Sequence, residues 1–363
     1  MRILRSYEPP APKRVLITRL SAVGDCVLTI PLAVEIKRMW PECHISWIVD
    51  CAAAQLLEEH PAVDEVIRLR KHWLKYPGEW RNLRDQLRSS EFDCVFDPQG
   101  LTKSSLLGWL SGCHTRLGYD YSHGREIAPL LATQRVHRSV RHMVDTHLLL
   151  LQPWREFAPG SGQFQMPIYE TAAARADEIL LMADNACHRF TGDLPLSQGR
   201  IGINPGASSP RRIWPVERYG IVARELFEQF GMRSIVFWNG EAEKLMAQVI
   251  AEQSRGSATV VPETNLCELA ELIRRCNLFI CGDTGPLHIA SAMGTPTVGL
   301  HGVTWADESG SYGNCNLAVQ SPLVPVNRRQ RRHGPSFAMQ AIEIEEVLQA
   351  CRHVLCSSQR AAA

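Results

Sequence analysis

Short apolar runs alternate with amphipathic stretches along most of the chain. The short runs are typical of buried parallel strands, and the longer stretches, with a period near 3.6 residues, are typical of helices. Strands are predicted at Val15–Thr18, Ile45–Val49, Val66–Leu69, Cys94–Phe96, Ile201–Asn204, Ser234–Trp238, Ala258–Val261, Leu278–Cys281 and Thr297–Leu300. Helices are predicted at Cys26–Met39, Ala52–Glu59, Glu79–Ser89, Leu101–Leu110, Thr171–Ala186, Val216–Gln229, Glu241–Gln253, Leu266–Arg275, Leu287–Met293 and Glu343–Leu355. This alternation predicts an α/β protein with parallel sheets flanked by helices.

The alternation is interrupted once, at Pro153–Pro167, a segment with the Pro and Gly content of a linker. A chain of 363 residues is also too long for one typical core. We therefore expect two doubly wound domains facing each other across a cleft, at residues 1–165 and 166–340. The last segment, residues 341–363, has an apolar helix face and is a candidate for packing back on the first domain. That face is formed by Ile344, Val347, Leu348 and Cys351.

Composition narrows the functional classes. The chain is 45% hydrophobic and 21% charged, as in ordinary soluble proteins, and its net charge of +1 gives no reason to expect nucleic acid as a partner. Its 12 cysteines show no C-x-x-C pair and no Cys/His metal spacing, so they indicate free thiols in a reducing compartment. Met1–Lys13 lacks an apolar signal core, and no stretch is long enough to span a membrane. We expect a cytoplasmic protein, with association at a membrane surface left open.

One loop carries the clearest chemical signal. The predicted strand Leu278–Cys281 is followed by Gly282-Asp283-Thr284-Gly285 and then by a helix from about Pro286. The carboxyl end of a parallel strand and the amino end of a helix together favour an anion. Thr284 and His288 would add donors on one helix face. Asp283 and Thr284 are also ordinary N-cap types, and His288 could be a core histidine, so the residues alone leave both interpretations open.

Two loops of the first half also follow predicted strands. Asp25 ends the loop Ser21–Asp25, where it could serve as an N-cap or as a general base. The loop Asp97–Ser104 offers a carboxylate, an amide and an ammonium group at Asp97, Gln99 and Lys103, which suits a polyhydroxylated or phosphorylated acceptor; the alternative is a capped turn with Lys103 in solvent. Neither loop contains G-x-G-x-x-G, so a dinucleotide site is not supported.

Two loops of the second half complete the set. Asn204–Pro215 contains Ser208, Ser209 and Arg212 beside a helix start, a combination suited to a diphosphate. Glu243 follows the strand Ser234–Trp238 and could accept hydrogen bonds from sugar hydroxyls or simply favour a helix N-terminus. Two basic clusters lie at Arg68–His72 and Asn327–His333. Each is either an ordinary solvated surface or a positive patch that attracts an anionic acceptor or anionic lipid.

Together these motifs resemble glycosyltransferase family 9, the ADP-heptose:lipopolysaccharide heptosyltransferases. Asp283–His288 followed by Gly294-Thr295-Pro296 resembles the family's donor-binding signature, and Ile17–Asp25 resembles its first strand and loop. Asp97–Ser104 and His123-Gly124-Arg125-Glu126 are similar to the heptosyltransferase I type. The resemblance extends from about Arg14 to Leu355.

The resemblance implies a GT-B architecture of two Rossmann-like domains, with no metal and no cofactor. It implies that ADP-heptose binds the C-terminal domain and that the Kdo of a lipid A inner core binds the N-terminal domain. Asp25 matches the family's catalytic aspartate, which would deprotonate the acceptor hydroxyl in an inverting displacement. The donor-binding residues would be Ser208, Ser209, Arg212, Glu243, Asp283, Thr284, Gly285 and His288. The acceptor-binding residues would be Asp97, Gln99, Lys103 and Arg125.

Two departures from the family pattern keep alternatives open. Arg212 stands where the family commonly has lysine, and the loop at Asn204-Pro205-Gly206 looks more like other branches of the family. The alternatives are the same reaction with a different nucleotide sugar or acceptor, and a GT-B protein that binds nucleotide sugar without catalysis. A two-lobed solute-binding protein is disfavoured by the many unpaired cysteines and the missing signal segment.

Overall fold

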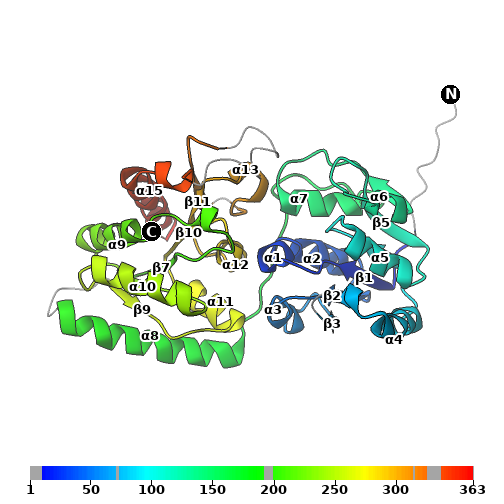
Figure 1. The fold of residues 1–363 in the computed structure, drawn as a ribbon, viewed down its shortest axis with the longest axis horizontal. Coiled ribbons are helices and arrows are strands. Elements are labelled where there is room, and N and C mark those ends of the chain that lie inside the picture. Colours follow the sequence, from blue (N-terminus) through cyan, green and yellow to red (C-terminus); the bar gives the residue numbers. More distant parts are fainter. Residues whose placement is uncertain (1–9, 71–72, 192–198, 314, 325–336, 363) are drawn as a thin grey trace. The chain divides into compact units, whose positions relative to one another are not determined.

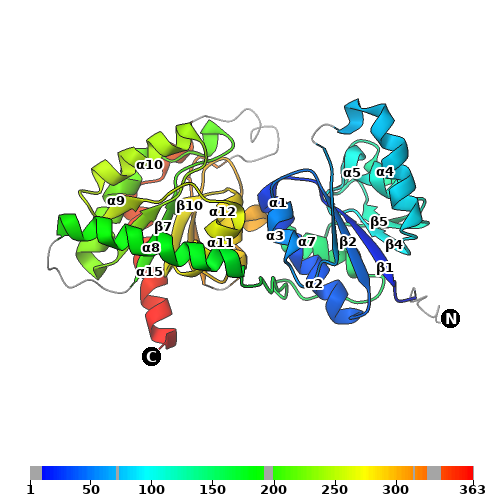
Figure 2. The same cartoon turned by 90° about the horizontal axis from the view of Figure 1, so that it is seen from below.

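The computed structural model describes residues 10–70, 73–191, 199–313, 315–324 and 337–362. The chain divides into two compact units, Met1–Pro167 and Ile168–Ala363. Each unit contains one six-stranded parallel sheet with helices packed around it (Figures 1 and 2). This is the doubly wound α/β class that the alternation of strands and helices predicts.

The first unit alternates strands and helices from its start. Its strands are β1 (Arg14–Thr18), β2 (His44–Val49), β3 (Glu65–Arg68), β4 (Cys94–Phe96), β5 (Thr115–Tyr119) and β6 (Gln134–Val136). Its helices are α1 (Val23–Val27), α2 (Ile30–Met39), α3 (Ala54–Glu58), α4 (Pro77–Ser89), α5 (Thr102–Leu110), α6 (Ala128–Leu131) and α7 (Met143–Leu148), with 3-10 turns η1 (Trp73–Lys75) and η2 (Leu149–Leu151).

The second unit begins with a long helix and then alternates in the same way. Its strands are β7 (Arg200–Asn204), β8 (Arg233–Val236), β9 (Ala258–Val260), β10 (Leu278–Gly282), β11 (Thr297–His301) and β12 (Asn316–Gln320). Its helices are α8 (Glu170–Thr191), α9 (Val216–Phe230), α10 (Glu241–Gln253), α11 (Leu266–Arg274), α12 (Gly285–Ala292), α13 (Ala306–Ser309) and α15 (Ile344–Ala362), with 3-10 turns η3 (Pro210–Arg212) and η4 (Met339–Ala341).

The two sheets share one strand order. It is β3-β2-β1-β4-β5-β6 in the first unit and, read from the opposite edge, β9-β8-β7-β10-β11-β12 in the second. In each sheet the order reverses between the first and fourth strands, which are β1 and β4 in one unit and β7 and β10 in the other. In open α/β sheets, ligands bind outside the carboxyl ends of the strands at such a reversal. The topology therefore marks one candidate binding edge in each unit.

The last helix corrects one expectation. Instead of packing back on the first domain, α15 buries Val347, Leu348 and Cys351 in the core of the second unit, against α9 and β12. Trp214 is fully buried in the same core, and its indole N–H donates to the Ile342 carbonyl at 3.0 Å. The apolar face of the helix is thus consumed within its own unit.

The predicted first helix, Cys26–Met39, is in fact two. α1 ends at Val27 and α2 begins at Ile30, with Pro31 in its first turn. Proline has no N–H to donate to the preceding turn, so the helix is interrupted just before it. The break leaves α1 as a helix of five residues that directly follows the loop after β1.

Candidate active site

The loops that the sequence marks for chemistry lie at the two points of strand-order reversal. In the first unit they are the loops after β1 and β4 with the helix starts that follow them, which contain Asp25 and Asp97–Lys103. In the second unit they are the loops after β7 and β10 with the turn and the helix start that follow them, which contain Ser208–Arg212 and Asp283–His288. Two independent lines, side-chain chemistry and sheet topology, thus select the same edges.

Asp25 sits in the first turn of α1 with its carboxylate partly in solvent. One oxygen, Oδ2, accepts from the Ala22 backbone N–H at 3.3 Å and pairs with the Arg19 guanidinium at 2.9 Å. Its side chain is 45% exposed, whereas that of Arg19 is only 6% exposed. The carboxylate is therefore oriented from one side and accessible from the other, as a general base requires.

Arg19 is a site residue that the sequence reasoning did not assign. Its Nη1 donates to the Pro98 carbonyl at 3.0 Å, and its own carbonyl accepts from the Trp47 indole at 3.1 Å. The side chain thus bridges the loops after β1 and β4 and holds Asp25 between them. A charged residue immediately after the buried strand β1 is the signal that could have indicated it.

Lys103, at the start of α5, joins three loops. Its ammonium group donates to Ser21 Oγ at 3.3 Å and lies 3.6 Å from Asp50 Oδ2. Asp50 follows β2 directly and was not singled out by the sequence. Lys103 is about one-third exposed, so it keeps a solvent-facing side at the same sheet edge as Asp25.

Asp97 and Gln99 are held within the protein, and their contact with an acceptor stays a prediction. Asp97 is buried, and its carboxylate accepts from the backbone N–H groups of Gln99 and Gly100 and from the Ser105 hydroxyl. Gln99 is buried too, and its Oε1 accepts from Leu20 N–H at 2.9 Å. The Asp97 carboxylate and the Gln99 side-chain oxygen thus stabilise the loops after β4 and β1.

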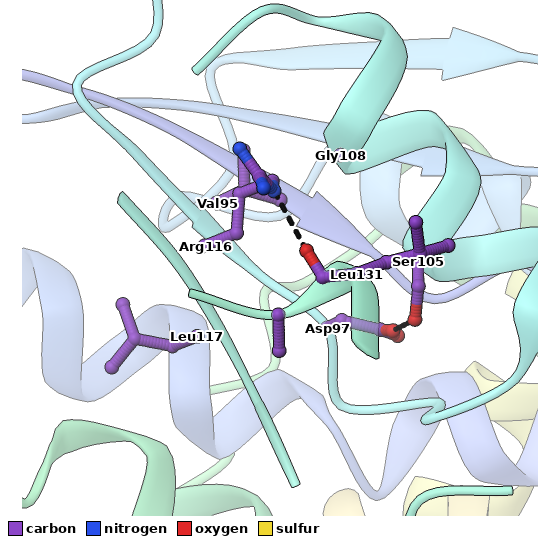
Figure 3. A pocket seen from close by; sticks show the side chains of 8 residues that line it. Val95, Asp97, Ser105, Gly108, Arg116, Leu117 and Leu131 are labelled. Carbon is purple, nitrogen blue, oxygen red and sulfur yellow. Dashed lines mark hydrogen bonds between the residues drawn. The ribbon is translucent and has the colours of Figure 1, made fainter. Parts of the chain in front are cut away.

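Figure 3 shows the Asp97 carboxylate turned toward Ser105. Both belong to a small pocket whose remaining lining residues are Val95, Gly108, Arg116, Leu117, Leu131 and Ala132. Burial raises the pKa of Asp97, and the hydrogen bonds from Ser105 and the loop N–H groups partly oppose that effect. The pocket lies between α5 and the strands β4 and β5.

Arg125 remains exposed beside the same loop. Its backbone N–H donates to the Gly100 carbonyl at 2.9 Å, which ties the segment before α6 to the loop after β4. Gly100 has a φ of 63°, a conformation that glycine adopts without strain. The arrangement brings Arg125 near the start of α5, and its contact with an acceptor stays a prediction.

In the second unit, Asp283 is the centre of a buried charged cluster. Its Oδ1 lies 3.5 Å from His288 Nε2, and its Oδ2 lies 3.7 Å from Arg212 Nη1 and 3.3 Å from Ser309 Oγ, which donates to it. Burial would raise the pKa of Asp283. The adjacent His288, with His301 and Arg212, outweighs burial and holds that pKa well below its usual range.

His288 faces this cluster instead of solvent. Its side chain is 7% exposed, and its Nδ1 has no hydrogen-bond partner among the described residues. His301, at the end of β11, is fully buried nearby; burial lowers its pKa, although Asp283 opposes that effect. His288 therefore holds Asp283 in this structure, and its direct contact with a diphosphate stays a prediction.

The start of α12 offers donors to an anion. Thr284 is the N-cap, yet no side chain caps the helix, and Thr284 Oγ1 instead donates to the Gly282 carbonyl at 3.3 Å. Thr284 and Gly285 are both partly exposed. The uncapped end presents backbone N–H groups and the positive end of the helix dipole.

Arg212 lies beside that helix start. Its Nη1 donates to the Asp283 carbonyl at 3.1 Å, while its side chain stays 31% exposed. The backbones of Gly282 and Arg212 lie close together: a Cβ on Gly282 would be only 2.8 Å from the Arg212 carbonyl oxygen. The buried Trp214 anchors the same segment. One face of the guanidinium is thus fixed, and the rest is available to an anionic ligand.

The serines and Glu243 belong to the same edge. Ser208 is exposed, and Ser209 is the partly buried residue that precedes η3. Glu243 Oε2 accepts from Asn239 N–H at 2.9 Å, and the carboxylate lies directly against Gly206. Burial raises the pKa of Glu243, with the Asn239 hydrogen bond opposing. The contact between Gly206 and Glu243 thus brings together the loop after β7 and the start of the helix after β8.

The contact between Gly206 and Glu243 allows a test. A Cβ at position 206 would overlap with the Glu243 carboxylate, the end of a flexible side chain. We expect Gly206→Ala to fold normally, to displace that carboxylate and to weaken nucleotide-sugar binding, measured by calorimetry. Gly78→Ala, whose Cβ would meet nothing within 4 Å, is the matched control.

A double variant decides whether Glu243 carries that effect. In the Glu243→Ala background the overlap is relieved, so adding Gly206→Ala should cause no further loss of affinity. An equal loss in both backgrounds would show that Gly206 acts independently of Glu243.

Further features concern metal ligands, helix length and the basic clusters. No group of three or more His, Cys, Asp or Glu side chains suited to a metal ion occurs among the described residues. None of the helices in the described part of the chain is long and apolar enough to cross a bilayer. Arg68 and Arg70 of the first basic cluster pair with Glu58 and Glu79. The Asn327–His333 cluster falls outside the described residues.

Comparison with known proteins identifies the family. Residues 80–335, more than half of the chain, match the model of glycosyltransferase family 9 (heptosyltransferase). The chain belongs to glycosyltransferase family 9. Lipopolysaccharide heptosyltransferase 1 of Escherichia coli strain K12 is 26% identical over 317 residues, covering 85% of this chain and 94% of that protein.

Solved structures agree on the fold of this family 9 enzyme. A family 9 glycosyltransferase from Veillonella parvula superposes with a TM-score of 0.79 at 24% identity, covering 97% of this chain and 100% of the other. The E. coli heptosyltransferase WaaC with ADP gives a TM-score of 0.72 at 23% identity, covering 94% and 99%. The protein is a glycosyltransferase of GT-B fold, as the motifs implied.

Proposed function

We propose that this enzyme is an inverting, metal-independent heptosyltransferase that moves heptose from ADP-heptose to the Kdo of the lipopolysaccharide inner core. The observation that carries the proposal is the position of two features: an accessible carboxylate, Asp25, and an anion-binding loop, Asp283–His288, each at the strand-order reversal of its own sheet. Family membership gives these features their chemical meaning.

The reaction divides between the two units. In the first, Asp25 takes the proton from the acceptor hydroxyl as that oxygen attacks the anomeric carbon. The bond from this carbon to the diphosphate breaks in the same displacement, which inverts the configuration. In the second, the Arg212 guanidinium and the N-terminus of α12 stabilise the charge that develops on the leaving diphosphate.

Cations support the assignment of the acceptor side. Kdo carries a carboxylate and lipid A carries phosphates, so the acceptor is anionic. The partly exposed Lys103 and the exposed Arg125 both lie next to the loop after β4 and supply positive charge there. Relatives named lipopolysaccharide heptosyltransferase 1 support a lipopolysaccharide acceptor.

The acceptor also bears on location. A lipid A-linked acceptor places the enzyme at a membrane surface, and we propose a cytoplasmic protein in peripheral contact with the inner face of the inner membrane. The near-zero net charge is consistent with local contacts to anionic lipid and gives no role to nucleic acid.

A second candidate keeps the reaction and changes the sugar or acceptor. It is favoured by Arg212, which donates to the Asp283 carbonyl at 3.1 Å and stands where the family commonly has lysine. An assay with ADP-heptose, ADP-glucose and UDP-sugars, each offered with acceptors ending in Kdo or in heptose, separates the two candidates. We expect transfer only from ADP-heptose and only to Kdo; preference for another pair would support the second candidate.

Chelation should leave the activity unchanged. The proposed mechanism meets the diphosphate charge with Arg212 and backbone N–H groups, so no metal ion is required for departure of ADP. Transfer rates measured with and without an excess of EDTA should agree within error. A rate that falls with EDTA and returns on addition of Mg²⁺ or Mn²⁺ would contradict the metal-independent mechanism.

A further inference from the structure

Two cysteines meet beside the candidate base. Cys26, in α1, and Cys51, in the bend after β2, have their Sγ atoms 4.0 Å apart, and both are free thiols. Cys26 follows Asp25 in the chain, and Cys51 follows Asp50, the partner of Lys103. Each thiol therefore belongs to the residue that directly follows a charged residue of the site in the chain.

The geometry is close to that of a disulfide. A disulfide needs its sulfur atoms about 2.05 Å apart, so the pair must approach by about 2 Å. Cys51 lies in a bend between β2 and α3, outside any regular element, where a small backbone change can provide part of that movement. Cys26 is buried, and its Sγ lies 3.6 Å from the Arg19 carbonyl oxygen, so its surroundings fix the position of this sulfur.

The two thiols differ in character. The hydrogen bond with Cys26 lowers the pKa of Cys51, and the Ala53 N–H and Lys103 act in the same direction, while burial and the Asp50 carboxylate oppose them. Burial raises the pKa of Cys26 well above its ordinary value. Cys51 is also the partly exposed member of the pair. Cys51 is thus suited to attack an oxidant. Cys26 is assigned the second step by its position, because its Sγ lies 4.0 Å from that of Cys51.

We propose that Cys26 and Cys51 form an oxidisable dithiol, which a hydroperoxide converts to a disulfide that inhibits sugar transfer. The inhibitory part of this inference rests on the proposed function, whereas disulfide formation does not. The new bond draws the Cys51 segment toward α1 and shifts the neighbouring carboxylates Asp50 and Asp25. Asp50 then moves relative to Lys103, and Asp25 relative to Arg19.

The chemistry balances with one peroxide. The Cys51 thiolate attacks the terminal oxygen of the hydroperoxide, the O–O bond breaks, and the departing oxygen takes a proton, leaving a sulfenic acid. The Cys26 sulfur then attacks Cys51, the S–O bond breaks, and water leaves with the thiol proton. Two thiols lose two electrons in total, and hydrogen peroxide is reduced to two water molecules.

Mass spectrometry tests whether the bond forms. The full-length enzyme is treated with hydrogen peroxide, free thiols are alkylated, and the protein is digested with trypsin and chymotrypsin; chymotrypsin can cleave after Trp47 and so separates Cys43 from Cys51. We expect a linked peptide pair containing Cys26 and Cys51 that disappears after dithiothreitol. Failure to find this pair, with both residues alkylated as free thiols, would overturn the proposal.

Activity tests whether the bond inhibits. Peroxide should lower the transfer rate of the wild type at least tenfold, and dithiothreitol should restore it. Cys51→Ser and Cys26→Ala should keep their rates after the same treatment, whereas Cys267→Ser, a half-buried cysteine of the second unit, should lose activity as the wild type does. Equal inactivation of all variants would overturn the inhibitory role. If no transfer occurs before oxidation, the proposed function fails, while the linked peptides still report on the dithiol.

Discussion

Replacing Asp25 by asparagine is expected to lower kcat by about 10²- to 10⁴-fold, the usual contribution of a general base. The amide can still accept from the Ala22 N–H and still fits beside Arg19, so the loop after β1 keeps its shape. What is lost is the ability to take a proton from the acceptor hydroxyl. The rate is measured at saturating ADP-heptose and acceptor, and donor affinity, measured by calorimetry, should stay unchanged.

Asp85→Asn is the control for this variant. Asp85 belongs to the same unit and also pairs with an arginine, Arg84, but it is 65% exposed on α4 and away from the sheet edge. Its substitution should leave kcat unchanged. An Asp25→Asn enzyme that transfers sugar at close to the wild-type rate would show that another group accepts the proton.

Arg212→Gln is expected to weaken ADP-heptose binding by about 10- to 150-fold. Hydrogen bonds to a charged group contribute about 1.5–3 kcal/mol, and the glutamine cannot supply the positive charge. The Asp283 carbonyl also loses its donor at 3.1 Å, which loosens the anion-binding loop. Calorimetric titration with ADP and with ADP-heptose measures the effect, and the loss should be similar for both because the proposed contact is with the diphosphate that they share.

Arg224→Gln is the matched control for charge and exposure. Arg224 is 26% exposed, close to the 31% of Arg212, but it pairs with Glu225 and Glu228 on α9. Donor affinity should be unaffected by its loss. If both variants bind ADP equally well, the diphosphate does not contact Arg212.

The alternation of strands and helices was sufficient to predict the fold, but not every strand. The sequence reasoning missed β5, β6 and β12 because their residues do not form apolar runs: Thr115–Tyr119 and Gln134–Val136 both contain an arginine, and Asn316–Gln320 begins and ends with amides. β6 and β12 are edge strands, and neighbouring backbones hold them in place through the ladder. Tertiary pairing, which no local pattern reveals, decides their structure.

The sequence predicted which loops lie at the carboxyl edge of each sheet, whereas the roles of their side chains stay predictions. Asp25 and Arg212 are accessible, as expected of groups that meet ligands. Asp97 and Gln99 are buried in hydrogen bonds with their own neighbourhood. A polar residue after a strand can face a ligand or close a turn, and only the packed structure distinguishes the two.

Residues that orient the site were overlooked for a related reason. Arg19 and Asp50 each follow a strand directly, and His301 ends one, so all three lie at the carboxyl edge. Their roles depend on their partners: Arg19 pairs with Asp25 of the same segment, whereas Asp50 and His301 act with Lys103 and Asp283 from other loops. Examining the residue at every strand end would have found them, although their pairing requires the sheet order.

The most direct test of the central claim is the product of the wild-type reaction. The enzyme is incubated with ADP-heptose and Kdo-lipid A, and the acceptor is analysed by mass spectrometry while ADP is quantified. The proposed function predicts an acceptor heavier by one heptose residue and one equivalent of released ADP. An unmodified acceptor and intact ADP-heptose, in an enzyme that binds ADP normally, would contradict it.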